Sequence, residues 1–225
     1  MRQSIFAFFL GVVLFSAGAA AAAAPPDSLD FPLVEGMVWR YDSTLGESVS
    51  TVSRLEDGYL LNSRAPHLVI EQVLIPGDWG IVLLRGRSEV YFVETERTYE
   101  PPMPRFPLPA DVGMRWEWEG TEIVDGDEEI RSRIVGEVQS REKVRVPLGE
   151  FECLKVVITT SSSDGTESSS IQWVAPGIGP VKIRVEIEAG GLTGVMVWLL
   201  GYDVLEFELT SFEYPPTPPP GPDHS

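Results

Sequence analysis

Short strand-forming segments separated by turn residues follow one another from Val38 onward, and this pattern restricts the fold more than any other feature. Val, Ile, Tyr, Trp and Thr alternate with polar residues, and Gly, Asp and Pro interrupt the runs. Beyond the N-terminal segment, the 3.6-residue spacing of an amphipathic helix never persists for twelve residues. The sequence therefore predicts an all-β protein built from antiparallel strands.

Asp-Gly pairs mark three of the expected hairpin turns, because both residues tolerate the positive φ that tight turns require. The pair at 164–165 joins two long segments with matching alternation, which predicts a broad curved sheet. The other two pairs lie at 57–58 and 125–126. The expected strands lie near 36–43, 47–54, 58–63, 67–75, 80–85, 89–94, 114–124, 129–140, 142–147, 151–161, 167–174, 180–188, 194–200 and 204–213.

Proline punctuates the middle of the chain. The segment 100–109 (EPPMPRFPLP) contains five prolines, which cannot donate to a sheet ladder, so we expect a connection there rather than a strand. The connection is either a crossover inside one domain covering 25–213 or a boundary between two halves, 27–99 and 106–213. The small size of the first half and its short strands favour one domain.

Two segments resemble each other within the chain. FPLVEGMVWRY at 31–41 and FPLPADVGMRWEW at 106–118 share a Pro-containing lead-in, a glycine and two aromatic residues spaced by two. The glycine and the first tryptophan of one copy precede those of the other by 77 residues. Two explanations are open. Either the two segments begin two half-sheets that are built alike, or their similarity is due to chance.

The two ends of the chain differ in composition from the rest. Arg2 followed by the apolar run Ile5–Phe15 and a stretch of alanines predicts a cleaved signal peptide at 1–24, with an uncleaved membrane anchor as the alternative. We therefore expect a periplasmic or extracellular protein whose mature chain has no transmembrane segment. The Pro-rich residues 214–225 predict a disordered or polyproline II tail.

Charge and cysteine content narrow the choice of partners. The formal net charge of -17 argues against binding nucleic acid or anionic membrane headgroups and favours solubility. Cys153, the one cysteine, can form no internal disulfide and lies too far along the chain to carry an N-terminal lipid. Its strand-like surroundings predict a buried small side chain rather than a reactive thiol.

Motifs for catalysis and cofactors are absent from the sequence. The two histidines, His67 and His224, provide no zinc-binding pair, and neither a nucleophile elbow nor a phosphate-binding glycine loop occurs. The serine runs 161–163 and 168–170 are typical of exposed strand faces. We therefore predict no catalytic residues and no cofactor.

Acidic residues give two weaker candidates. Asp125, Asp127 and Glu129 alternate around a turn and form a calcium candidate without the complete loop of a calcium-binding motif, so a solvated hairpin tip is the simpler interpretation. Glu117 and Glu119 alternate with tryptophans, and a glycan-active enzyme would need two carboxylates across one aromatic-lined cleft. On a strand, however, these glutamates face away from Trp116 and Trp118.

Tryptophans are the candidate ligand-binding residues. Trp39, Trp116, Trp118 and Trp173 all fall on expected strands, where they form either a binding face or part of the core. The segment 192–200 (LTGVMVWLL) is apolar on both faces, as in a strand that is covered on both sides or that lines an apolar cavity.

A longer string in the second half resembles a known family. It reads VPLGEFECLKV at 146–156, followed by WVAPGIGPVK at 173–182. This is similar to the pattern V-P-x-G-x-F-x-C-x-K-V … W-x-A-x-G-x-G-x-V-K of uncharacterised exported bacterial β-domain proteins, whose architecture resembles the half-barrels of lipoprotein-localisation factors. Pro180 departs from the pattern, since an apolar residue is common there. The resemblance implies a fold and assigns no catalytic residue.

These observations lead to one expected fold and three hypotheses for function. We expect an antiparallel sheet curled into an open half-barrel. The leading hypothesis is a non-enzymatic envelope protein that binds an apolar ligand or a protein segment on its concave face. The alternatives are an interaction module that uses sheet edges or the Pro-rich tail, and a glycan-active enzyme.

Overall fold

The computed structural model describes residues 31–188 and 204–215, and every regular element in these ranges is a β-strand. No helix in the described residues is long and apolar enough to cross a membrane. The strands are β1 (Val38–Ser43), β2 (Gly46–Leu55), β3 (Gly58–Ala65), β4 (Leu68–Gly77), β5 (Gly80–Val90), β6 (Val93–Pro107), β7 (Arg115–Val124), β8 (Glu128–Val146), β9 (Gly149–Ser162), β10 (Glu167–Ala175), β11 (Gly179–Glu188) and β12 (Val204–Glu213).

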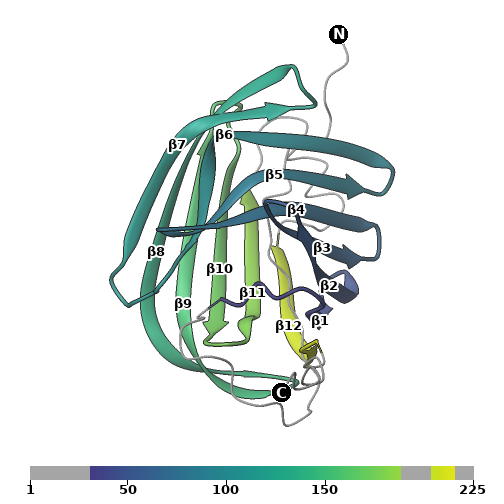
Figure 1. Cartoon of the computed structure of the whole chain (residues 1–225), viewed down its shortest axis with the longest axis vertical. Coiled ribbons are helices and arrows are strands. Elements are labelled where there is room, and N and C mark those ends of the chain that lie inside the picture. Colours follow the sequence, from purple (N-terminus) through teal and green to yellow (C-terminus); the bar gives the residue numbers. More distant parts are fainter. Residues whose placement is uncertain (1–30, 189–203, 216–225) are drawn as a thin grey trace, which may run out of the picture.

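The strands form a closed barrel. Each pairs antiparallel with its neighbours in sequence, and β1 pairs with β12 to complete the circuit. In Figure 1 the strands β8–β11 run roughly upright, while β3–β5 cross them. The all-β antiparallel prediction is confirmed, but the open half-barrel is wrong. Alternating side chains have the same pattern in open and closed sheets, so local sequence does not reveal closure.

Side chains from β1 also fasten the closure on the inside. Tyr41 donates its hydroxyl hydrogen to the backbone oxygen of Pro180 at 2.7 Å, and Trp39 donates its indole N–H to the oxygen of Ile178 at 3.1 Å. Both aromatic side chains are fully buried. These bonds connect β1 to the turn that precedes β11 and to the start of β11. Side-chain hydrogen bonds therefore support the closure of the barrel in addition to the backbone pairing of β1 with β12.

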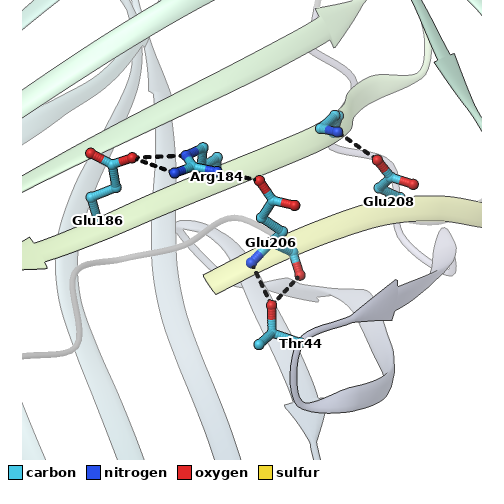
Figure 2. A network of polar contacts seen from close by, with 6 residues as sticks. Thr44, Arg184, Glu186, Glu206 and Glu208 are labelled. Atoms are coloured by element: carbon cyan, nitrogen blue, oxygen red, sulfur yellow. Dashed lines mark hydrogen bonds and ion pairs between the residues drawn. The ribbon is translucent and has the colours of Figure 1, made fainter. Parts of the chain in front are cut away.

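Ion pairs line the neighbouring β11–β12 seam (Figure 2). Arg184 contacts Glu206 on β12 at 2.6 Å and Glu186 on its own strand at 2.7 Å, and Lys182 contacts Glu208 at 2.5 Å. Thr44, in the β1–β2 turn, accepts a hydrogen bond from the Glu206 amide at 2.9 Å. Ion pairs this close to solvent contribute little to stability, so the network mainly helps to fix the register of the two strands.

The Pro-rich segment belongs to a strand, contrary to expectation. β6 runs through it to Pro107, and Pro104 pairs with Val82 on β5. Pairing of β6 with β7 ends at Glu100, so the prolines that follow need no N–H on that side. A peptide bond before Pro101 is cis.

Other expected boundaries also shift. The segments 129–140 and 142–147 form one strand, β8, with a register shift between Val138 and Ser140. The expected strand 89–94 is interrupted by the turn between β5 and β6. All three Asp-Gly pairs lie at hairpin turns, as predicted. The signal peptide, the strand at 194–200 and most of the tail lie outside the described residues, although Tyr214 bonds through its hydroxyl to the Gly177 oxygen.

The two similar segments adopt the same turn. Gly36 donates its amide to Val52 at 2.9 Å, and Gly113 donates to Val138 at 2.8 Å. The next residue of each copy accepts a bond back, from Val52 at 3.1 Å and from Val138 at 2.9 Å. Both glycines have positive φ, 84° and 90°. The two segments therefore lead into β1 and β7 through the same turn, and β1 and β7 each begin a run of six described strands.

Glycines on the inner face make room for tryptophan rings. A Cβ added to Gly136 would lie 2.1 Å from the Trp116 ring, and one added to Gly120 would lie 2.3 Å from the Trp118 ring. Gly136 pairs with Trp116 across β7 and β8. The indole thus lies flat on the backbone of the neighbouring strand, a contact that any side chain would prevent.

We expect Gly136→Ala to destabilise the fold by about 1–3 kcal/mol, because the new methyl group must displace the buried Trp116 ring. The matched control is Gly86→Ala, an inner-face register position where an added Cβ meets the Glu71 oxygen at an ordinary 3.5 Å. Chemical denaturation of both variants measures the difference. Equal stability of the two would show that the indole does not depend on the glycine.

Candidate functional site

Polar side chains occupy a large part of the barrel's inner face. Register pairs such as Ser50 with Ser63, and Thr160 with Ser168, place these side chains on one face of neighbouring strands. The prediction that 168–170 form an exposed polar face is wrong, because Ser168 and Ser170 are buried. The buried polar residues of strands β2–β4 and β6–β10 are Ser48, Ser50, Ser63, Gln72, Thr95, Arg97, Arg105, Glu122, Ser132, Thr160, Ser168, Ser170 and Gln172.

Part of this polar lining is internally paired. Arg97 on β6 donates to the Glu122 carboxylate on β7 at 2.7 Å, with both side chains buried. Ser50 and Ser63 share a hydrogen bond at 2.8 Å. A buried ion pair recovers the desolvation cost of its two charges only when both partners are present. The hydrogen-bonding groups of these residues therefore have partners within the fold.

Other buried polar atoms lack a hydrogen-bond partner in the protein. Folded proteins pair the large majority of such atoms, so a group of them on one inner face calls for an explanation. They are Ser48 Oγ, Gln72 Oε1, Arg105 Nε and Nη2, Trp116 Nε1, Thr160 Oγ1 and Ser168 Oγ.

Arg105 is the charged member of this group. It lies where β6 bulges, since Phe106 pairs with Ile81 and Pro104 with Val82, which leaves Arg105 as the extra residue. Its side chain is 4% exposed. Burial lowers the pKa of its guanidinium to about 10, a value that still leaves it protonated at neutral pH. Sequence reasoning missed this residue, because its proline-rich surroundings predict an exposed connection.

Tyr99 lies near Arg105 in the same interior. Burial, and secondarily the Glu122 carboxylate, raise the pKa of its phenol, so the hydroxyl stays neutral. The ring meets Trp118 edge-on at 6.2 Å between centroids. This part of the interior therefore combines aromatic surface with one buried positive charge that has no carboxylate bonded to it.

The four tryptophan candidates separate into two groups. Trp39, Trp116 and Trp118 are buried inside the barrel, and Trp118 donates to the Pro101 oxygen at 3.0 Å. Trp173 on β10 is half-buried, bonds to Glu142 through its indole N–H and lies 5.9 Å from the Lys182 ammonium. The structure thus brings Trp116 and Trp118 to the inner face and keeps Trp173 apart from them.

The acidic candidates do not form a metal centre. Asp125 has a φ of 51° in its turn and accepts a hydrogen bond from the Glu96 amide at 2.8 Å. Within 31–188 and 204–215, no three His, Cys, Asp or Glu side chains gather closely enough to hold a metal ion. Asp125, Asp127 and Glu129 are exposed at a hairpin tip, so the simpler interpretation describes them.

The carboxylates between the tryptophans point away from the barrel interior. Glu117 and Glu119 are exposed, and both contact Arg133, which lies 3.4 Å from Glu119. Among the described residues, Glu122 is the one buried carboxylate, and Arg97 binds it. No described pair of carboxylates faces an aromatic cleft, so nothing in this part of the chain favours glycan hydrolysis.

Grooves on the outer face are a weaker candidate site. One of about 350 Å³ over β8–β11 and one of about 560 Å³ over β7–β9 meet at Arg133 and Ser161. Hydroxyl groups line much of both grooves. The charge of Arg133 is already matched by Glu117 and Glu119. The interior therefore offers the stronger unmet hydrogen-bonding capacity.

Comparisons with known proteins give no family. No family model and no curated protein match the chain. A putative lipoprotein from Parabacteroides distasonis, known from its crystal structure, matches with 14% sequence identity and a TM-score of 0.41. The match covers 84% of this chain and 100% of the other. A likeness at this level carries no functional inference, so the function has to be derived from the barrel itself.

Cys153 is fully buried, and burial raises the pKa of its thiol to about 12, with a smaller contribution from Glu142. The thiol of the folded protein therefore stays protonated at neutral pH. Above a pH of about 8.5 the thiol of the unfolded chain ionises while that of the folded chain does not, so the free energy of unfolding falls as the pH rises further. The thiol is therefore packed apolar volume at neutral pH.

We expect the folded protein to resist a thiol reagent such as DTNB near pH 8, and the denatured protein to release one equivalent per chain. Cys153→Ala, which gives no signal in either state, is the control. Stoichiometric labelling of the folded chain within seconds would mean that the thiol is accessible and ionised.

Proposed function

We propose that this chain is an exported envelope protein that binds a small, largely apolar molecule inside its barrel and performs no covalent chemistry. One observation carries the proposal: on several strands of the barrel, buried polar atoms without protein partners lie among apolar side chains. Small-molecule sites combine these two features, with apolar walls for affinity and a few polar groups for orientation.

The dimensions of the barrel support this proposal. Barrel diameter grows with strand number, and eight strands already enclose an interior that side chains fill or that holds one small ligand. The described residues contribute twelve strands to the barrel, and a barrel of twelve strands is wider than one of eight. Export is supported by the sequence alone, through Arg2 and the apolar run Ile5–Phe15.

Native mass spectrometry of protein purified from its own host tests ligand binding. We expect a mass above that of the processed chain, and solvent extraction should release an apolar molecule of the same excess mass. Protein that has been unfolded, extracted and refolded provides the control, and it should show the bare mass. A bare mass before extraction, together with no binding of added dodecanol or dodecanoic acid, would contradict the proposal.

A second candidate function, binding of a protein partner, is favoured by two adjacent hairpin tips. Phe92, in the turn between β5 and β6, is 94% exposed. Its neighbour Tyr91 has a φ of 56°, stacks on His67 at 4.7 Å and donates its amide to the His67 oxygen at 2.8 Å. His67 has a φ of 63°. Strained backbone that presents an exposed aromatic ring is a feature of interaction sites.

Site-specific photo-crosslinking in the host envelope tests this second candidate. A benzophenone side chain in place of Phe92 should give one discrete product, whereas the same group in place of Val112, which is 52% exposed, should give none. The same absence of product at both positions would remove the hairpin tips as an interface. Labelling at both would indicate non-specific contact.

A further inference from the structure

We infer that the molecule bound inside the barrel carries a carboxylate and that Arg105 binds it side-on through Nε and Nη2. The inference deepens the proposed function and rests on it. Both nitrogen atoms are buried and lack a hydrogen-bond partner in the protein. The side chain is 4% exposed, so bulk water does not provide the missing bonds.

The identity of the two unpaired nitrogens indicates what they bind. Nε and Nη2 lie on one edge of the guanidinium plane, and their N–H bonds match the two oxygens of a carboxylate. The same protein shows this geometry on its surface: Arg87 donates through Nε to one oxygen of Glu94 at 2.6 Å and through Nη2 to the other at 2.8 Å. Arg105 presents the same edge inside the barrel without a protein carboxylate.

The other buried arginine provides a contrast. Arg97 lies eight residues earlier on β6 and donates to Glu122 at 2.7 Å, so its charge has a partner within the fold. Removing an ion from water is unfavourable unless a counter-charge and hydrogen bonds compensate. No protein carboxylate offsets the desolvation cost of the Arg105 guanidinium. This is the state expected of a residue that binds an anionic ligand.

The surroundings of Arg105 define the rest of the ligand. Met103 and Phe106 on β6 are buried, and their partners across the ladder, Leu83 and Ile81 on β5, are buried as well. These apolar residues exclude water from the guanidinium, which strengthens its attraction for an anion. An anion bound there would lie against these apolar side chains, so we take a carboxylate on an apolar body, such as an alkyl chain, as the ligand.

A pair of probes that differ only in the head group tests this inference. The processed full-length chain is titrated with dodecanoic acid and with dodecanol at neutral pH and followed by calorimetry. We expect the acid to bind at least tenfold more tightly than the alcohol, because only the acid accepts the two charge-assisted bonds. Dodecyl phosphate is the third probe, and a preference for it over the acid would overturn the carboxylate assignment.

Two substitutions separate charge from geometry. Arg105→Met should remove the acid's advantage over dodecanol, while Arg105→Lys should keep part of the advantage. The control Arg133→Met, on the outer face, should change neither affinity. A folded Arg105→Met protein that still prefers the acid would contradict the inference.

A melting experiment without ligand distinguishes a binding role from a structural one. If Arg105 is an unpaired buried charge, Arg105→Met should raise the melting temperature, by about 2–8 °C, because the desolvation cost is removed. A lower melting temperature would mean that the guanidinium holds the barrel together and would overturn the inference. If the wild-type protein binds dodecanoic acid and dodecanol equally well, the carboxylate inference is wrong and the proposed function stands. If it binds neither, the proposed function is wrong as well.

Discussion

The antiparallel pairing of β1 with β12 is the contact on which the rest of the barrel depends. Without it, both strands would present unpaired backbone groups, and the sheet would have an inner face open to water. With it, the described strands enclose one interior, and Trp39 and Tyr41 secure the seam by donating to backbone oxygens near β11. Closure therefore divides the alternating side chains into an interior set and a solvent-facing set. A polar group on the inner face is costly because closure removes it from water.

Local irregularities in the ladder decide which side chains enter that interior. The bulge in β6 buries Arg105 and Phe106 side by side, where regular alternation would have buried only one of them. Glycine at 136 accommodates an indole ring on the backbone of the adjacent strand. The turns at Gly36 and Gly113 repeat one pattern of backbone bonds, so the two halves of the barrel begin alike and differ in what their later strands carry inward.

Sequence patterns predicted the strands well because alternation and Asp-Gly turns are local signals, confirmed at 57–58, 125–126 and 164–165. Closure depends on pairing between distant strands and was missed. The buried serines on β10 were missed for a related reason: a polar face looks the same whether water or a barrel interior covers it. Arg105 was the hardest to predict, since the prolines around it hide the strand whose alternation turns its side chain inward.

Charge composition strengthens the interpretation of Arg105 as a ligand-binding residue. The chain has 34 acidic residues against 17 Lys and Arg, so carboxylates are not scarce. Exposed arginines obtain them readily: Arg87 contacts two glutamates, and so does Arg184. In such a chain, a buried arginine without a bonded carboxylate is best explained by a counter-ion from outside the fold. Stability alone would favour an apolar residue at this position, so the buried charge is consistent with a role in binding.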